Sequence, residues 1–407
     1  LVAEAQEQKP RVQRLLDRFA RWYTPLVIAV AVLLFVFTRD VELALTFLVI
    51  GCPGALVVAA PVAVVAGLGN AARSGLLIKG GERLERIGQV NVVAFDKTGT
   101  LTRGRPRVTA VVPFDHTPET RVLSLAAAAE QRSEHHLATA ILTHAREMGV
   151  APALAEEWRL EPGAGAVARS GGDLVLVGNR RLLQAHGIAL SQEQEAAVAG
   201  REALGDTVAL VAAGGRPVGL LGITDPVRPE AAGLVAALQA AGVRHTVMLT
   251  GDNQAAAERV ARRLGVSEVR AALSPEEKVQ AIRQLQAAGH VVAMVGDGIN
   301  DAPALAAADV AVAMGASGTQ AAIEAADVAL MSDRIERVPR AIDLSRRIMA
   351  VVRQNVAIAV TVVVLLLVGV VSRKVLLGGG MLVHEASVLV VILNGMRLLR
   401  IRKETAV

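Results

Sequence analysis

The chain of 407 residues contains a single cysteine, and aromatic residues make up only 2% of it. One cysteine excludes disulfide bonds within the chain and any Cys-x-x-Cys metal module. The sequence contains no Gly-Lys-Ser or Gly-Lys-Thr, so the phosphate-binding loop of ABC-type pumps is excluded. The net charge of +5 is modest and the arginines are scattered or flank apolar runs, so we expect no nucleic-acid surface. No signal peptide is visible at the N-terminus.

Apolar residues, by contrast, make up 53% of the chain, and the longest apolar runs form two blocks. The first block covers 25–37 and 43–68, and the second covers 356–371 and 375–393. A short charged stretch divides each block, which predicts four membrane helices in two hairpins. Buried core helices are the alternative, but the Val- and Leu-rich runs lack a polar face. The long segment between the hairpins would then begin and end on one side of the membrane.

The most informative segment is Asp-Lys-Thr-Gly-Thr-Leu-Thr at 96–102, which follows the apolar run 92–95. This pattern places the Asp96 carboxylate at the end of a strand. The backbone N–H groups of the turn and Lys97 can then receive phosphate oxygens. Carboxylates so placed act as nucleophiles and form aspartyl-phosphates. An ordinary strand and turn with a polar cap is the alternative, which the matching segments downstream disfavour.

Three downstream segments complete the pattern. Thr-Gly-Asp at 250–252 follows an apolar run, Lys278 lies in Ser-Pro-Glu-Glu-Lys, and Gly-Asp-Gly-Ile-Asn-Asp occupies 296–301 after another apolar run. Polar loops after apolar strands are typical of a doubly wound parallel sheet, whose ligands bind beyond the carboxyl ends of the strands. Each segment alone is weak evidence, because turns favour these residues. Together, and in this order, they resemble the phosphorylation signature of P-type ATPases.

The resemblance implies phosphoryl transfer from ATP to Asp96, with Mg²⁺ held by oxygen ligands. Thr250 and Lys278 would neutralise the transferred phosphoryl oxygens. The expected catalytic residues are Asp96, Lys97, Thr98, Thr250, Gly251, Asp252, Lys278 and Asn300. The expected Mg²⁺ ligands are Asp96, Thr98, Asp297 and Asp301.

Thr98 separates a pump from a simple phosphatase. Phosphatases of the related haloacid dehalogenase type usually carry a second Asp two positions after the nucleophile, as general acid and base. With Thr98 there, water is poorly activated and the phosphoenzyme should persist, as a transport cycle requires. A membrane-anchored phosphatase of that type is the alternative function.

Polar residues inside the apolar runs indicate the cargo. Cys52 lies in Gly-Cys-Pro-Gly, where Pro53 breaks the helical hydrogen bonding and a thiolate favours soft or borderline cations. His384 and Glu385 add an imidazole and a carboxylate near the last run, and such groups at membrane depth are functional by default. The alternatives without a role in transport are that Cys52 is a small buried residue and that His384 and Glu385 are a polar pair at the membrane interface. Asn355 could add a ligand, although a polar cap at a helix end is the simpler interpretation.

The Cys-Pro pair and its spacing to Asp96 narrow the resemblance to heavy-metal-transporting P-type ATPases. Gly54 replaces the second cysteine that many members carry. One thiolate with His384 and Glu385 suits a divalent ion such as Zn²⁺, Cd²⁺, Co²⁺ or Fe²⁺ better than Cu⁺. The alternatives are a Cu⁺ transporter of the same family and a metal-binding membrane partner without catalysis.

The segment 109–217 is expected to be an inserted nucleotide-binding domain. Ser-Glu-His-His-Leu-Ala at 133–138 resembles the family's Ser-Glu-His-Pro-Leu motif, and glycine pairs let the backbone approach the nucleotide closely. The implied nucleotide-binding residues are Glu130, His135, Gly163, Gly165, Gly178 and Asn179. The Gly-Ala-Gly stretch is no dinucleotide fingerprint, because the required acidic residue is absent.

The expected fold is a multidomain membrane protein. It would combine transmembrane α-helices with an α/β Rossmann-like phosphorylation domain of the haloacid dehalogenase type, into which an α+β nucleotide-binding domain is inserted. The expected boundaries are 1–87 for membrane helices with the Cys-Pro motif, 88–108 and 218–340 for the phosphorylation domain, 109–217 for the insert, and 341–407 for the C-terminal membrane helices.

The resemblance covers the C-terminal part of such a pump. The family's actuator domain carries Thr-Gly-Glu, which is absent here, as are the first membrane helices. The expected partners are therefore a metal ion, the lipid bilayer and that missing N-terminal part. Alone, the chain should be phosphorylated but dephosphorylate poorly. We expect a bacterial plasma membrane location with the catalytic loop in the cytosol, and export by analogy.

Overall fold

The structure is a computed structural model that describes residues 10–133, 136–161, 163–252, 254–298, 301–315, 320–332 and 334–400. Its contacts divide the chain into two compact units. The first unit comprises 1–93, 236–244 and 282–407, and the second comprises 94–235 and 245–281.

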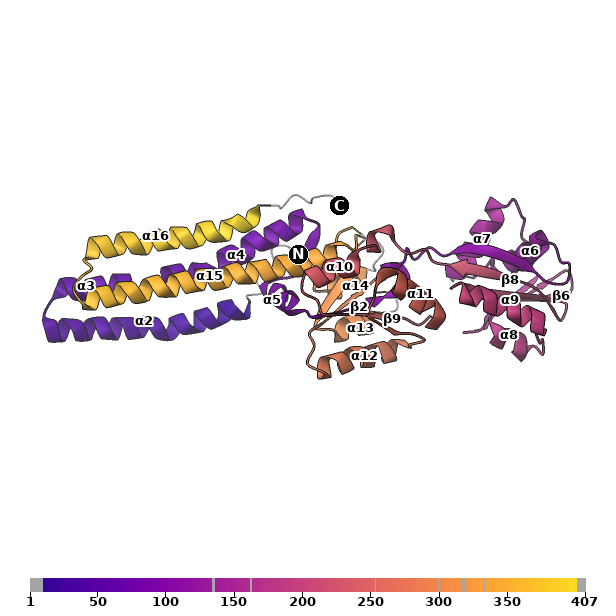
Figure 1. The fold of residues 1–407 in the computed structure, drawn as a ribbon, viewed down its shortest axis with the longest axis horizontal. Coiled ribbons are helices and arrows are strands. Elements are labelled where there is room, and N and C mark those ends of the chain that lie inside the picture. The colour runs from indigo at the N-terminus through magenta and orange to yellow at the C-terminus, as the bar shows by residue number, and fades with distance from the viewer. Residues whose placement is uncertain are drawn as a thin grey trace. The chain divides into compact units, whose positions relative to one another are not determined.

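The helices long and apolar enough to cross a membrane belong to the first unit, where they lie side by side (Figure 1). They are α2 (Arg11–Thr38), α3 (Val41–Ile50), α4 (Gly54–Arg73), α15 (Arg337–Val371) and α16 (Leu377–Met396). With α3 and α4 counted as one broken span, the described residues hold four candidate spans, which confirms the predicted number. The 28 residues of α2 extend about 42 Å, more than the roughly 30 Å of a bilayer core.

A polar network joins three of these helices. Asn355 on α15 is fully buried and donates to the carbonyl oxygen of Ala59 on α4 at 3.1 Å. Asn394 on α16 donates in turn to Asn355 Oδ1 at 2.7 Å. Asn355 therefore lies within a helix and not at its end, and the polar cap expected there is wrong.

A seven-stranded sheet has the order β1-β13-β12-β11-β2-β9-β10. Its strands are β1 (Leu76–Ile78), β2 (Val92–Asp96), β9 (His245–Leu249), β10 (Glu268–Arg270), β11 (Val292–Gly296), β12 (Val310–Met314) and β13 (Val328–Leu330). The pairs β11–β12, β12–β13 and β9–β10 are parallel, whereas β1 pairs with β13 in the antiparallel sense. Strands β2, β11 and β12 are buried throughout, as strands of a covered parallel sheet are. The doubly wound sheet predicted from the sequence is confirmed.

Helices alternate with these strands along the chain (Figure 1). They are α5 (Gly81–Gln89), α10 (Leu234–Ala240), α11 (Gln254–Leu264), α12 (Pro275–Ala287), α13 (Ala302–Ala307) and α14 (Gln320–Ala325).

Arg346 ties the long helix α15 to this part of the first unit. Its guanidinium donates to the carbonyl oxygens of Gly88 at 3.1 Å, Val90 at 2.7 Å and Gly242 at 3.3 Å, and also to that of Ala241. These carbonyls lie where α5 and α10 end, and a helix leaves its last carbonyls without partners of its own. One side chain of α15 thus satisfies the ends of two other helices.

The second unit contains a six-stranded antiparallel sheet of order β3-β8-β7-β6-β5-β4. Its strands are β3 (Arg107–Pro113), β4 (Glu157–Glu161), β5 (Gly165–Ser170), β6 (Asp173–Gly178), β7 (Thr207–Ala213) and β8 (Arg216–Thr224). Helices α6 (Glu119–Glu130) and α7 (His136–Glu147) cover one face, and α8 (Arg180–Ala185) and α9 (Gln192–Ala203) cover the other (Figure 1).

Alternating side chains of this sheet form its two cores. Val175 and Val177 pack with α6 and α7, whereas Leu176 between them packs with α8 and α9. Successive residues of a strand point to opposite faces, so one strand serves both cores.

Candidate functional site

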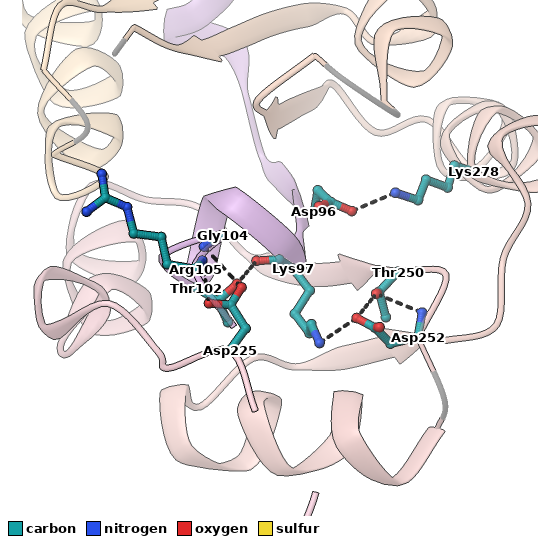
Figure 2. A network of polar contacts seen from close by, with 9 residues as sticks. All are labelled: Asp96, Lys97, Thr102, Gly104, Arg105, Asp225, Thr250, Asp252 and Lys278. Atoms are coloured by element: carbon teal, nitrogen blue, oxygen red, sulfur yellow. Dashed lines mark hydrogen bonds and ion pairs between the residues drawn. The ribbon is translucent and has the colours of Figure 1, made fainter. Parts of the chain in front are cut away.

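Asp96 ends β2 and is 5% exposed. Lys278 near the start of α12 directs its Nζ to Asp96 Oδ1 at 2.6 Å, and Lys278 is also 5% exposed (Figure 2). A carboxylate and an ammonium can be buried together only if each offsets the charge of the other. The Lys278 ammonium is thus the charge partner of the Asp96 carboxylate, the group that acts as the nucleophile in aspartyl-phosphate chemistry.

Lys97 and the Thr-Gly-Asp segment form a second charged group. Lys97 Nζ lies 2.5 Å from Asp252 Oδ2, which also accepts from Thr250 Oγ1 at 3.0 Å (Figure 2). Thr250 Oγ1 accepts in turn from the backbone N–H of Asp252 at 3.1 Å. Thr250 is buried just after β9, and a Cβ on Gly251 would stand 3.3 Å from the carbonyl oxygen of Leu273. The structure therefore brings together residues that lie far apart in sequence.

The turn after Asp96 has a conformation that its sequence explains. Thr98 is extended, with φ −75° and ψ 131°, and Gly99 has φ 73°. A positive φ strains residues with a Cβ, so glycine is the natural residue there. The irregular turn, η1 (Lys97–Leu101), returns the chain so that Thr102 N–H donates to the carbonyl oxygen of Lys97 at 3.0 Å.

Arg228 hydrogen-bonds to this turn and Asp225 to the residues just after it. Neither residue was predicted from the sequence. Asp225 accepts from Thr102 Oγ1 at 2.5 Å and from the N–H groups of Gly104 at 3.0 Å and Arg105 at 3.1 Å (Figure 2). Buried Arg228 donates to the carbonyl oxygen of Gly99 at 2.7 Å. The one signal in the sequence was the polar Asp-Pro-Val-Arg-Pro segment at 225–229, directly after an apolar strand.

Asp297 and Asp301 follow β11 in the first unit. Asp297 is half-buried and Asp301 is 1% exposed at the start of α13. A Cβ on Gly296 would approach Asp301 Oδ2 to 2.3 Å, so glycine makes room for that carboxylate. Asn300 lies outside the described residues. Two carboxylates after one strand are the hard oxygen donors that Mg²⁺ prefers, so their chemistry fits this ion.

The predicted nucleotide-binding residues line one cavity of about 740 Å³ in the second unit, apart from His135, which lies outside the described residues. Gly165 and Gly178 are needed because β5 and β6 meet closely there. A Cβ on Gly165 would be 2.2 Å from the carbonyl oxygen of Val177. Asn179 donates from Nδ2 to the carbonyl oxygen of Gly163 at 2.9 Å.

Glu130 is the buried carboxyl group of this cavity, with 8% of its surface exposed. Burial raises its pKa, and a hydrogen bond with Ser133 opposes the shift.

The Cys-Pro-Gly break lies between α3 and α4. Cys52 is exposed, and a Cβ on Gly54 would lie 3.7 Å from Nε2 of His384 on α16. His384 is 5% exposed, and its Nδ1 has no hydrogen-bond partner among the described residues. Glu385 is exposed, and no group of three metal-ligating side chains is found among the described residues. The structure thus brings His384 to the break but leaves Glu385 apart from it.

The chain is similar to known proteins over nearly its whole length. Residues 90–309 match the haloacid dehalogenase-like hydrolases. The manganese-exporting P-type ATPase of Mycobacterium tuberculosis (strain ATCC 25618 / H37Rv) is 42% identical over 98% of this chain and 56% of its own length. The zinc-exporting P-type ATPase of Mycobacterium marinum (strain ATCC BAA-535 / M) is 41% identical over 99% of this chain and 55% of its own length. The chain belongs to the heavy-metal-transporting P-type ATPases.

Solved structures agree with that family. A zinc-transporting PIB-type ATPase in its E2.Pi state aligns with a TM-score of 0.79 at 40% identity, over 98% of this chain and 66% of that one. The catalytic domain of the CPx-ATPase CopB-B aligns with a TM-score of 0.54 at 30% identity, over 67% of this chain and 96% of that one. The P-type ATPase fold predicted from the sequence is confirmed. The chain spans a little over half the length of the curated relatives named above.

Proposed function

We propose that the protein containing this chain uses ATP to export a divalent metal cation, through a phosphoryl group carried on Asp96. The supporting observation is the buried ion pair of Asp96 and Lys278, 2.6 Å apart. An Asp96 carboxylate oxygen attacks the terminal phosphorus of ATP, and the bond from that phosphorus to the ADP oxygen breaks. The Lys278 ammonium then neutralises the oxygens of the arriving phosphoryl group.

The neighbouring groups have supporting roles in this proposal. Lys97 and Thr250 donate to the phosphoryl oxygens, and Asp252 orients both side chains through the contacts described above. Thr98 offers no carboxylate to activate water, so the phosphoenzyme persists until another part of the protein promotes hydrolysis. The actuator domain expected in the longer protein would supply that step.

Mg²⁺ would be held by Asp96, Thr98, Asp297 and Asp301, with Asn300 in support. When bound, it offsets the negative charge of the transferring phosphoryl group. ATP would occupy the cavity of the second unit, with Glu130 at the adenine end and the glycines along the phosphates. His135, which lies outside the described residues, is proposed to help orient the adenine.

The cargo site is proposed at the helix break, with Cys52 and His384 as ligands and Glu385 as a third that must turn inward. One thiolate, one imidazole and one carboxylate suit borderline divalent ions better than Cu⁺. Relatives named for manganese, zinc and cobalt/nickel export agree with a divalent cargo. A bacterial plasma membrane with the catalytic loop in the cytosol is the proposed location.

The domain boundaries remain a proposal as well. The antiparallel sheet runs from β3, which begins at Arg107, to β8, which ends at Thr224. We therefore propose that the nucleotide-binding insert covers 107–224 and not 109–217. The phosphorylation domain would flank it on both sides.

Acid-stable phosphorylation from labelled ATP tests the function. The full-length protein is assayed with Mn²⁺, Zn²⁺, Co²⁺, Ni²⁺, Cd²⁺, Fe²⁺ and Cu⁺, and with Asp96→Asn as the control. We expect a phosphoenzyme stimulated by one or a few divalent ions and absent in the control. Hydrolysis of small phosphomonoesters without nucleotide, with no phosphoenzyme under any metal, would instead establish a phosphatase.

A further inference from the structure

Trp158 on the edge strand β4 has a specific attachment to helix α6. Its indole N–H donates to the carbonyl oxygen of Ala129 at 2.7 Å. Ala129 belongs to the last turn of α6, whose carbonyls lack partners within the helix. A tryptophan N–H usually finds a partner when the ring is partly buried, and here it satisfies a helix end.

The residue after Ala129 is Glu130, the buried carboxyl group of the nucleotide cavity. Beyond it, the N–H of Ser133 donates to the carbonyl oxygen of Glu130 at 3.0 Å, and the two side chains are also hydrogen-bonded. Glu130 is therefore held from both sides, by Ser133 after it and by Trp158 through the preceding carbonyl. Without the indole bond, the last turn of α6 can fray and the Glu130 carboxylate loses its fixed position.

Trp158 also lines the cavity itself. Among the described residues that line it, Trp158 is the one aromatic side chain, and Gly163, Gly165 and Gly178 present backbone without side chains. Trp158 also packs against the core under α6 and α7. A rigid apolar surface beside a carboxyl group suits a flat heterocycle with an amino group at its edge.

We propose that Trp158 is a positioning residue of the nucleotide cavity: its N–H fixes the end of α6 and hence Glu130, and its ring forms the wall against which the adenine base lies. This inference rests on the proposed function, because it requires that the cavity bind ATP. It adds a residue that acts through Glu130 and sets base affinity without touching the phosphates.

Trp158→Phe removes the N–H and keeps a ring. The full-length protein is titrated with ADP and with a non-hydrolysable ATP analogue, and Kd and stoichiometry are measured. We expect Kd to rise by up to about fivefold, the limit reached if the whole contribution of a neutral hydrogen bond, about 1 kcal/mol, is lost from the nucleotide-bound state alone. The factor should be the same for both nucleotides, because Trp158 does not reach the phosphates, and the number of binding sites should not change.

A double-mutant cycle with Glu130→Gln tests whether Trp158 acts through Glu130. If it does, Trp158→Phe has less effect on Kd in the Glu130→Gln protein than in the wild type. Equal effects in both backgrounds would overturn the positioning role. Fewer binding sites at unchanged Kd would also overturn it, because that result reports a purely structural contribution.

The second tryptophan supplies a matched control. Trp22 lies on α2 and is 80% exposed, and the chain has two tryptophans in all. In Trp22→Phe protein, Trp158 is the remaining tryptophan of this chain. Its emission is obtained as the difference between Trp22→Phe protein and the Trp22→Phe/Trp158→Phe double variant, and ADP should quench or shift that difference with the Kd found by titration. Nucleotide binding with unchanged emission would refute the ring contact, even if Trp158→Phe does not fold. A wild-type protein that binds neither nucleotide would refute the proposed function itself.

Discussion

Asp96 and Cys52 both lie where a regular element stops, Asp96 at the end of β2 and Cys52 between α3 and α4. At Asp96 the charged groups are buried and in contact, with Lys278 at 2.6 Å. At Cys52 the thiol is exposed, the His384 Nδ1 has no partner among the described residues, and Glu385 is exposed. The proposed phosphoryl-transfer site is thus preorganised, whereas at the proposed cargo site Cys52 and Glu385 are both exposed.

This difference agrees with the two proposed tasks, catalysis at Asp96 and metal transport at Cys52. Catalysis needs donors that are fixed before charge develops, since reorganisation at that moment would raise the barrier. Transport needs a site that can form and open again, and broken helices provide such sites in transporters.

Lys278→Met should lower the rate of phosphoenzyme formation by about 100- to 1,000-fold, the usual effect of removing one donor to a developing anion. Rapid-quench measurement with labelled ATP checks this. Lys278→Arg keeps the charge and should retain far more activity. If the methionine variant is phosphorylated at the wild-type rate, the Asp96–Lys278 pair has no catalytic role.

Cys52→Ser and His384→Ala should each raise the metal concentration for half-maximal phosphorylation by about 100-fold or more. Even residues that only support a ligand contribute about 10- to 100-fold. ATP affinity should stay unchanged, which serves as the internal control. Glu385→Gln discriminates between two states. If the metal concentration for half-maximal phosphorylation changes by no more than about twofold, Glu385 stays exposed, as in this structure. A large rise means that Glu385 turns toward the helix break and binds the metal.

Asp225→Ala should slow phosphorylation about tenfold at saturating ATP, because the segment just after the turn that carries Lys97 and Thr98 loses three hydrogen bonds. Small displacements of reacting groups are costly. Thermal unfolding measured in parallel reports the loss of stability. Asp115→Asn, at an exposed loop position, is the control. An unchanged rate with a lower Tm would assign Asp225 to stability alone.

Glu130 predicts a mild pH dependence of nucleotide affinity. Burial raises its pKa, so on acidification Glu130 is protonated at a higher pH than an ordinary glutamate. If the ionised form accepts a hydrogen bond from adenine, affinity falls as the pH drops through that raised pKa. ADP titrations from pH 8 to pH 5 measure it. In Glu130→Gln protein, the affinity for ADP should not fall over this pH range. The same fall in that variant would assign the pH dependence to another group.

The meeting of Asp96, Lys97 and Thr250 was predictable because their motifs are contiguous and follow apolar strands, and parallel strands collect their carboxyl ends at one edge. Lys278 lies on a helix, and only its motif pointed to this group. Asp225 was missed because its partner Thr102 lies 123 residues earlier, and no local pattern links them. The membrane helices exceed the apolar runs because polar residues such as Arg14 and Arg353 continue the same helices.

The proposed cargo site shows what could not be predicted from the sequence. His384 and Glu385 are neighbours in sequence, but successive residues of a helix point about 100° apart, so only one faces the break. Which one does so depends on how α16 packs against α4. That is a property of tertiary contacts between small residues such as Gly54 and not of the motif.

The most direct test of the account locates the phosphoryl group. Full-length protein is phosphorylated with ATP and the stimulating metal, reduced with borohydride, and mapped by mass spectrometry, because an acyl phosphate is reduced to an alcohol where a free carboxylate is not. We predict homoserine at position 96 after ATP and metal, and unmodified aspartate when ATP is omitted. Acid-stable phosphate on another residue, with Asp96 unmodified, would contradict the account.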